Sequence, residues 1–198
     1  MVDLPPNLQE RVLCSIMAAV KYEVPVNIVL AVAEKEGGKP ELWVKNSNGT
    51  YDVGSMQFNT AYLRDLKKYG ITPEDVAKPG CYSFDLAAWR LREHLRNDKN
   101  DLWTRAANYH SRTPKFNALY RSDLKRKATI WAHWLEERFD TYPVVNPGLT
   151  PARLIQKEST APQVTENRIK TQELPGNPQA LNALNAFFTA NPRRRGFS

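Results

Sequence analysis

The sequence predicts a mainly α fold of the α+β class. A helical domain over residues 5–140 carries a small β-hairpin and precedes an extended Pro-rich C-terminal tail over residues 141–198. Three observations indicate this. Apolar residues recur at helical spacing through most of the domain. Asn48-Gly49, the strongest two-residue hairpin signal, interrupts them. Half of the fourteen prolines then fall in the tail, less than a third of the chain.

Two amphipathic helices are predicted near the N-terminus. The apolar face of the first is formed by Leu8, Val12, Ile16, Met17 and Val20. The second runs from Pro25 to Glu36, because proline suits the first turn of a helix and Gly37 suits the left-handed residue that ends one. Glu36 is therefore expected at the C-terminal end of a buried helix.

The predicted hairpin over residues 44–53 is followed by further helical segments. These are expected over residues 59–69, briefly after Thr72-Pro73, over residues 83–97 with Ser83 as N-cap, after Asp101, and over residues 113–139. The side chains expected to face the core are Phe84, Leu86, Leu91 and Leu95, and in the last helix Phe116, Leu119, Tyr120, Ile130, Trp131, Trp134 and Leu135.

The composition narrows the classes of partner. The 198 residues include 28 Lys and Arg against 21 Asp and Glu, a formal net charge of +7 that favours nucleic acid, anionic lipid or a cell-wall polymer. No stretch approaches the roughly 18 apolar residues of a membrane-spanning helix, so we expect no membrane span. The first residues lack a secretory signal, so we expect either an intracellular protein or a mature form whose signal was removed.

Metal and phosphate sites are not expected. The three histidines, His94, His110 and His133, form no HxxxH or HExxH pair, and the glycines after Glu36 follow a helix instead of opening one. We therefore expect no catalytic metal and no cofactor. Cys14 and Cys81 are too far apart for a CxxC motif, so they either pair with each other or are buried thiols.

Glu36 is the candidate acid. At the C-terminal end of an apolar helix, the helix dipole and desolvation both raise the pKa of a carboxyl group, which can then act as a general acid near neutral pH. Spacing alone leaves open that Glu36 is an ordinary exposed glutamate. Glu34 points to another face and is expected to be solvated.

A second feature is the segment over residues 48–59, Asn-Gly-Thr-Tyr-Asp-Val-Gly-Ser-Met-Gln-Phe-Asn. Its glycines permit tight turns, Gln57 offers an amide for sugar or peptide groups, and Asn59 can cap the next helix. Together with Glu36-Gly37-Gly38 and the later Ala-Asn-Tyr-His-Ser at residues 107–111, this segment resembles the three motifs of the family 1 lytic transglycosylases, which have the Slt-type, lysozyme-like fold. The resemblance covers roughly residues 10–125 and is closest to the small transglycosylases of type IV secretion, conjugation and pilus systems.

The resemblance implies an activity and a site. Glu36 would be the single acid/base that cleaves peptidoglycan between N-acetylmuramic acid and N-acetylglucosamine, leaving a 1,6-anhydromuramoyl product. The implied substrate-binding residues are Ser55, Met56, Gln57, Asn59, Tyr109 and Tyr120. Met56 and Gln57 would line the groove, Tyr109 would position Glu36 through its hydroxyl group, and Tyr120 is a weaker candidate for the groove wall. The resemblance also implies a Cys14–Cys81 disulfide and hence a periplasmic or otherwise exported protein.

Three departures from the family pattern stand out. Gly37 replaces the usual serine, Ser55 replaces the usual leucine, and one residue is missing between Glu36 and Pro40. The missing serine puts efficient catalysis in question, because that residue can orient the carboxyl group.

Two other functions stay open. The first is a lysozyme-type peptidoglycan hydrolase, for example of phage origin, which Asp52 would serve as a second carboxylate. The favoured reading of Asp52 is a residue that orders the hairpin. The second is a non-catalytic glycan or nucleic-acid binding module, although we do not expect nucleic acid as the partner.

The tail contributes four of the seven net positive charges. A short amphipathic helix is expected near residues 179–190, with Leu181, Leu184, Phe187 and Phe188 on one face. It would either dock on the domain or bind a partner, such as a component of an envelope-spanning secretion apparatus.

Overall fold

The computed structural model describes Leu4 and residues 6–141. Its helices are α1 (Pro6–Tyr22), α2 (Val26–Glu36), α3 (Thr60–Leu66), the 3-10 helix η1 (Lys67–Tyr69), α4 (Pro73–Ala77), α5 (Tyr82–Asn97), α6 (Leu102–Ala107) and α7 (Pro114–Glu136). Its strands are β1 (Trp43–Lys45), β2 (Tyr51–Val53) and β3 (Phe58–Asn59). The prediction of a mainly α, lysozyme-like fold is confirmed. The tail helix expected near residues 179–190 lies outside the described residues.

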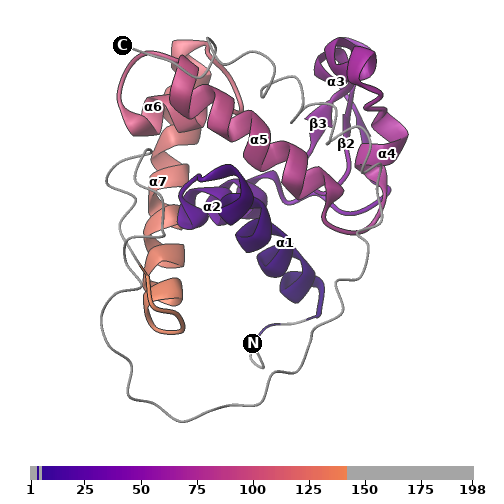
Figure 1. The fold of residues 1–198 in the computed structure, drawn as a ribbon. Coiled ribbons are helices and arrows are strands. Elements are labelled where there is room, and N and C mark those ends of the chain that lie inside the picture. Colours follow the sequence, from indigo (N-terminus) through magenta and orange to yellow (C-terminus); the bar gives the residue numbers. More distant parts are fainter. Residues whose placement is uncertain (1–3, 5, 142–198) are drawn as a thin grey trace.

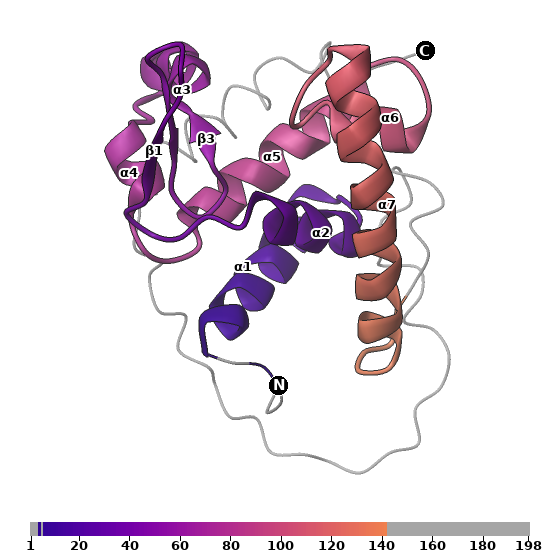
Figure 2. The same ribbon diagram turned by 180° about the vertical axis from the view of Figure 1, so that it is seen from behind.

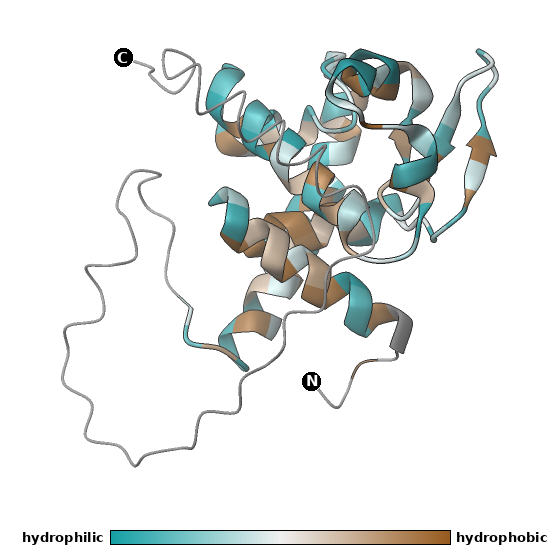
Figure 3. Cartoon of the chain, turned by 45° about the vertical axis from the view of Figure 1, so that its right-hand side comes forward, coloured by the Kyte–Doolittle hydropathy of each residue, from teal (hydrophilic) through white to brown (hydrophobic). Residues whose placement is uncertain are grey.

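Helix α2 lies at the centre of the helical part, where α1, α5 and α7 pack against it (Figures 1 and 2). Its middle is fully apolar, and residues 28–33 are all buried. Figure 3 shows the most hydrophobic turns gathered at this centre. Burying every side of α2 fixes the position of its last residue, Glu36.

The sheet lies beside the helical part together with α3 and α4 (Figure 1). Strands β1 and β2 form the predicted hairpin, with Val44 opposite Asp52. Strand β3 pairs antiparallel with β2 and was not predicted, since two residues are too short to show an alternating pattern. Asn59 caps α3 as expected, because its side chain accepts a hydrogen bond from the Ala61 amide at 2.9 Å.

The end of α2 follows the sequence prediction. Gly37 adopts the left-handed conformation with φ of 61°, and its N–H group donates to the carbonyl oxygen of Ala33. The predicted N-cap of α5 is wrong, because α5 begins at Tyr82 and Ser83 lies within its first turn with no exposed surface. Cys81, which the disulfide holds against α1, occupies the cap position instead.

Part of the predicted core is wrong. Phe116, Leu119 and Ile130 of α7 are 52%, 68% and 55% exposed, and Met17 and Val20 of α1 are also exposed. Each of the two helices buries a stripe of residues, several of them small. The buried stripe includes Cys14, Ser15, Ala18 and Ala19 in α1 and Asn117, Leu124 and Ala128 in α7. Small residues let helices approach closely, so the larger apolar side chains beside that stripe are left outside.

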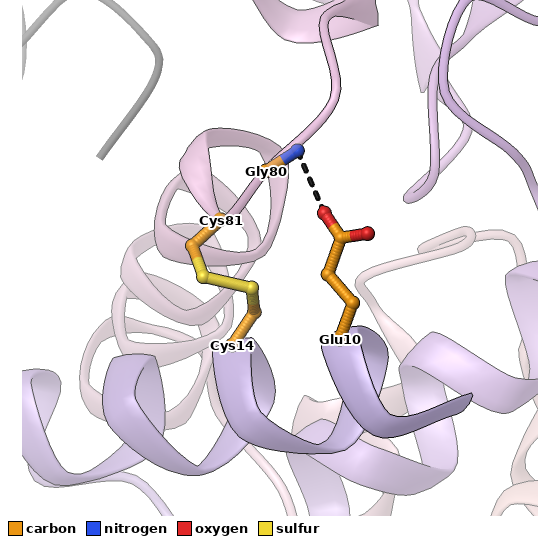
Figure 4. Close-up of a disulfide and its surroundings, with 4 residues drawn as sticks. All are labelled: Glu10, Cys14, Gly80 and Cys81. Atoms are coloured by element: carbon orange, nitrogen blue, oxygen red, sulfur yellow. Dashed lines mark hydrogen bonds between the residues drawn. A yellow bond between two sulfur atoms is a disulfide. The ribbon is translucent and has the colours of Figure 1, made fainter. Parts of the chain in front are cut away.

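The Cys14–Cys81 disulfide joins α1 to the start of α5 across 67 positions of sequence. Figure 4 shows the bond beside a second link, in which the Gly80 amide donates to Glu10 Oε1 at 2.8 Å. Within the described residues, no helix is long and apolar enough to cross a bilayer.

Removing the disulfide should lower the free energy of unfolding by about 4 kcal/mol, because closing a loop of this length restricts the unfolded chain. Urea denaturation of a Cys14→Ala/Cys81→Ala double variant, with Glu10→Gln as the comparison for the neighbouring hydrogen bond, measures this. An unchanged urea midpoint in the double variant would contradict the prediction.

Candidate functional site

Glu36 is the last residue of α2 and is partly buried. The hydroxyl group of Tyr120, from α7, donates to Glu36 Oε1 at 2.6 Å. Tyr120 itself is buried. A carboxyl group that is removed from water and held by one directed donor has a fixed orientation, as a proton-transfer group requires.

The environment raises the pKa of Glu36 to about 7, from an ordinary value of 4.5. Burial is the main cause, because it disfavours the charged carboxylate. The Tyr120 hydrogen bond and the positive charges of Arg90 and Lys35 act in the opposite direction, and the negative charge of Asp52 raises the pKa further. Near neutral pH, Glu36 is therefore present in both its acid and its base form.

Gly38, the second residue after α2, packs against the turn before β3 with no space for a side chain. A Cβ atom on Gly38 would lie 2.2 Å from the Gly54 carbonyl oxygen and 2.8 Å from Gln57 Nε2. Arg11 Nη2 also donates to the Gly38 carbonyl oxygen, at 3.1 Å. The close packing of Gly38 joins the end of α2 to the turn before β3 and brings Gln57 close to the chain that follows Glu36.

Residues 54–57 form that turn. Gln57 has a positive φ of 47°, a conformation that residues other than glycine rarely adopt, and its Nε2 donates to the Gly54 carbonyl oxygen at 2.9 Å. The prediction that Met56 lines a groove is wrong, because its side chain is fully buried in the core. Ser55 is only 5% exposed, so Gln57 is the residue of this turn with an accessible polar side chain.

The two tyrosines do not have the contacts that were predicted for them, and Tyr109 is buried in the core. Tyr109 was predicted to contact Glu36 through its hydroxyl group, but that group donates to the Met56 carbonyl oxygen at 3.2 Å. Tyr120, predicted only as a wall residue, makes the hydrogen bond to Glu36. Tyr109 is nevertheless close enough for the charge of Glu36 to contribute to its raised pKa, for which burial is the main cause.

Asp52 has the structural surroundings of a hairpin residue. Its Oδ1 accepts a hydrogen bond from Asn59 Nδ2 at 2.9 Å, and the same amide group donates to Thr50 Oγ1. Asn59 also caps α3, so one side chain connects the two strands and the helix. Asp52 makes no hydrogen bond to Glu36 among the described contacts, although its charge acts on that residue.

Two charged residues at the site, Lys35 and Arg90, were not predicted, whereas His110 belongs to the predicted motif at residues 107–111. His110 is exposed and stacks on the Tyr120 ring, with centroids 4.8 Å apart, and Lys35 Nζ lies 4.9 Å from the centroid of that ring. Arg90 lies over the Tyr109 ring. Its place between the apolar residues Trp89 and Leu91 was the one signal for Arg90 in the sequence.

Glu34 lies on another face of α2 than Glu36 and makes more contacts than expected. Its side chain is 39% exposed, but it forms an ion pair with Lys127 and accepts a hydrogen bond from Trp131 Nε1 at 2.8 Å. Glu34 thus joins α2 to α7.

Over the described residues, no group of three or more His, Cys, Asp or Glu side chains is arranged to hold a metal ion.

Comparison with known proteins gives consistent matches. Residues 13–129 match the family described as Transglycosylase SLT domain. Protein IpgF of Shigella sonnei is 34% identical over 83 residues, which cover 41% of this chain and 55% of IpgF. Invasion protein IagB of Salmonella typhimurium is 26% identical over 125 residues, which cover 61% of this chain and 74% of IagB. The chain thus spans only about half the length of the IpgF proteins that it matches.

The raised pKa of Glu36 predicts a stability change with a defined sign. In the unfolded chain the carboxyl ionises around pH 4.5, whereas in the folded protein it ionises only near pH 7, so the free energy of unfolding falls between these values. Glu36→Gln avoids this loss. The variant should therefore be more stable than the wild type by about 2–3 kcal/mol at pH 8 and about equally stable at pH 4.

Urea denaturation at both pH values measures the difference, with the exposed Glu74→Gln as the matched control. Equal stabilities of wild type and Glu36→Gln at pH 8 would show that the carboxyl is not desolvated.

Proposed function

Because this chain belongs to the transglycosylase SLT domain family, we propose that it is a peptidoglycan lytic transglycosylase that cleaves the β-1,4 bond between N-acetylmuramic acid and N-acetylglucosamine. The observation that carries the proposal is the state of Glu36. It is a single carboxyl group, partly buried, hydrogen-bonded by Tyr120 and poised with a pKa of about 7. Such a group can serve first as an acid and then as a base within one catalytic cycle.

In the first half of the proposed reaction, Glu36 is protonated. It donates its proton to the glycosidic oxygen as the bond between that oxygen and muramoyl C1 breaks, and the N-acetylglucosamine leaves with a free 4-hydroxyl group. Positive charge develops at C1, and Glu36 becomes a carboxylate. The Tyr120 hydroxyl group favours this charged form by donating to Oε1.

In the second half, Glu36 acts as the base. The muramoyl C6 hydroxyl group attacks C1, and the Glu36 carboxylate takes the hydroxyl proton. The bond from O6 to C1 closes the 1,6-anhydro ring and returns Glu36 to its protonated state. No water is consumed, and no second carboxylate is needed, because the substrate itself supplies the nucleophile. Gln57 is the proposed polar contact to the sugar beside the cleaved bond.

The competing proposal is hydrolysis of lysozyme type, with Asp52 as the second carboxylate. Asp52 is near enough to raise the pKa of Glu36, which favours this alternative. Its hydrogen bond from Asn59 instead supports a role in ordering the hairpin. The chemical form of the product decides between them, because water yields a reducing end and the C6 hydroxyl group yields an anhydro end.

The proposed setting is the cell wall outside the cytoplasm. The family acts on peptidoglycan, and the Cys14–Cys81 disulfide fits an oxidising compartment. One matched relative is named an invasion protein. We infer that this chain opens the wall locally for an envelope-spanning secretion, conjugation or pilus apparatus, and that the basic tail contacts a component of that apparatus or an anionic wall polymer.

Digestion of purified sacculi should release anhydromuropeptides, and Glu36→Gln should reduce their release at least about 100-fold, since proton transfer to and from the substrate is lost. Mass spectrometry of the products measures this. Asp52→Asn serves as the control and should still yield anhydro products. Reducing-end products from the wild type would overturn the proposal in favour of hydrolysis.

Deletion of residues 141–198 should leave the release of anhydromuropeptides from sacculi nearly unchanged, because every described residue that acts on the pKa of Glu36 lies before the deletion. Assembly of the apparatus in cells should weaken. Normal assembly with the deleted protein at wild-type abundance would argue against a role for the tail.

A further inference from the structure

Arg90 lies in the middle of α5 inside a group of three aromatic rings. Its guanidinium carbon is 4.2 Å from the ring centroid of Tyr62, 4.7 Å from that of Tyr109 and 5.9 Å from that of Phe58. These rings also contact one another, since Phe58 stacks with Tyr62 and meets Tyr109 edge-on. Arg90 is partly buried, and its Nε is a buried donor with no hydrogen-bond partner.

No carboxylate pairs with Arg90 among the described residues, and this separates it from the arginines and lysines around it. On the same helix, Arg96 pairs with Glu23 at 3.0 Å. Near the site, Lys35 pairs with Asp123 at 2.7 Å, and Arg112 pairs with Asp98 at 3.1 Å. The charge of Lys35 is therefore largely compensated by its own partner, whereas that of Arg90 is not.

Aromatic rings stabilise a cation without neutralising it. The negative face of each ring attracts the guanidinium group, but a ring carries no net charge that would cancel the field of the cation at longer range. In surroundings of low polarity that field is screened less than in water. The three rings thus hold a positive charge at a fixed position and leave it free to act on other groups.

The field of Arg90 reaches the catalytic candidate. The groups that act on the pKa of Glu36 are Tyr120 from α7, Arg90 from α5, its own neighbour Lys35 and Asp52 from β2. Tyr109, whose ring is 4.7 Å from the Arg90 guanidinium carbon, is acted on by the charges of both Arg90 and Glu36. Of the two cations in this set, Arg90 has the larger effect on the pKa of Glu36. The field also acts on Tyr62, His94, Tyr109, His110 and Tyr120.

We propose that Arg90 is a positioning residue that acts through Glu36: its aromatic cage keeps an unpaired positive charge beside the catalytic carboxyl and stabilises the carboxylate formed between the two halves of the reaction. This inference rests on the proposed function for its catalytic meaning. The electrostatic relation between Arg90 and Glu36 is a property of the free protein. It can therefore be tested whether or not the protein cleaves glycan strands.

The test is a titration of the full-length chain by NMR, which follows the side-chain carboxyl carbon of Glu36, assigned by its loss in Glu36→Gln. Arg90→Met removes the charge but keeps a side chain of similar length, and Arg90→Gln is a second neutral variant. Arg90→Lys restores the charge. Arg96→Met, which removes from the same helix a cation that is paired with Glu23, is the matched control. Melting curves of every variant establish that it is folded.

Arg90→Met and Arg90→Gln should shift the pKa of Glu36 upward by about half a unit or more, as expected on loss of a partly screened charge at close range. Arg90→Lys and Arg96→Met should titrate like the wild type. If the protein releases anhydromuropeptides, the basic limb of its pH–rate profile should move to higher pH in the same two neutral variants.

An unchanged Glu36 titration in both neutral variants would overturn the inference. So would an equal shift in Arg96→Met, because the effect would then not be specific to Arg90. A raised KM with an unmoved pKa would assign Arg90 to direct substrate binding instead. Absence of glycan cleavage by the wild type, with the predicted titration shifts present, would refute the proposed function and leave the electrostatic relation standing.

Discussion

The site depends on the removal of one carboxyl group from water. Glu36 ends a helix whose apolar residues are buried on every side, so the packing of α1, α5 and α7 around α2 decides how much solvent reaches it. A surface glutamate would be ionised at neutral pH and could not donate a proton. Because burial is the main cause that raises the pKa of Glu36 to about 7, the same packing that stabilises the domain also supplies its candidate acid.

Burial alone would make Glu36 too weak an acid, and the surrounding charges correct this. Tyr120 donates a hydrogen bond to the carboxyl group, and Arg90 and Lys35 supply positive charge, while Asp52 opposes them. These groups come from α7, α5, α2 and β2, so the balance is a property of the assembled fold. A shift of any one of these elements would change the pKa of Glu36 without any change in Glu36 itself.

The sequence allowed prediction of those features that depend on local conformation. The roles of Gly37 and Asn59 could be predicted from the local sequence. Glycine is the residue that best adopts the left-handed conformation at the end of a helix such as α2, and an asparagine before a helix such as α3 is a common N-cap. The donor to Glu36 could not be predicted in this way. Tyr120 is 84 positions from Glu36, and the direction of its hydroxyl group follows from how α7 crosses α2. Arg90 was missed for the same reason, since its aromatic cage joins residues from three parts of the chain.

Two glycines follow Glu36, and the structure gives a different reason for each. Gly37 stands where the family has serine, and its φ of 61° suits glycine at the end of a helix. Gly38 then packs so closely against Gly54 and Gln57 that any side chain would collide with backbone atoms. The short segment after Glu36 thus joins the end of α2 directly to the turn before β3. A Cβ atom on Gly37 itself would lie 3.6 Å from the nearest atom, the Glu34 carbonyl oxygen, so the left-handed backbone and not a lack of space favours glycine there. With glycine at this position, the carboxyl group is oriented by the Tyr120 hydroxyl group of α7, a donor that lies 84 positions along the chain.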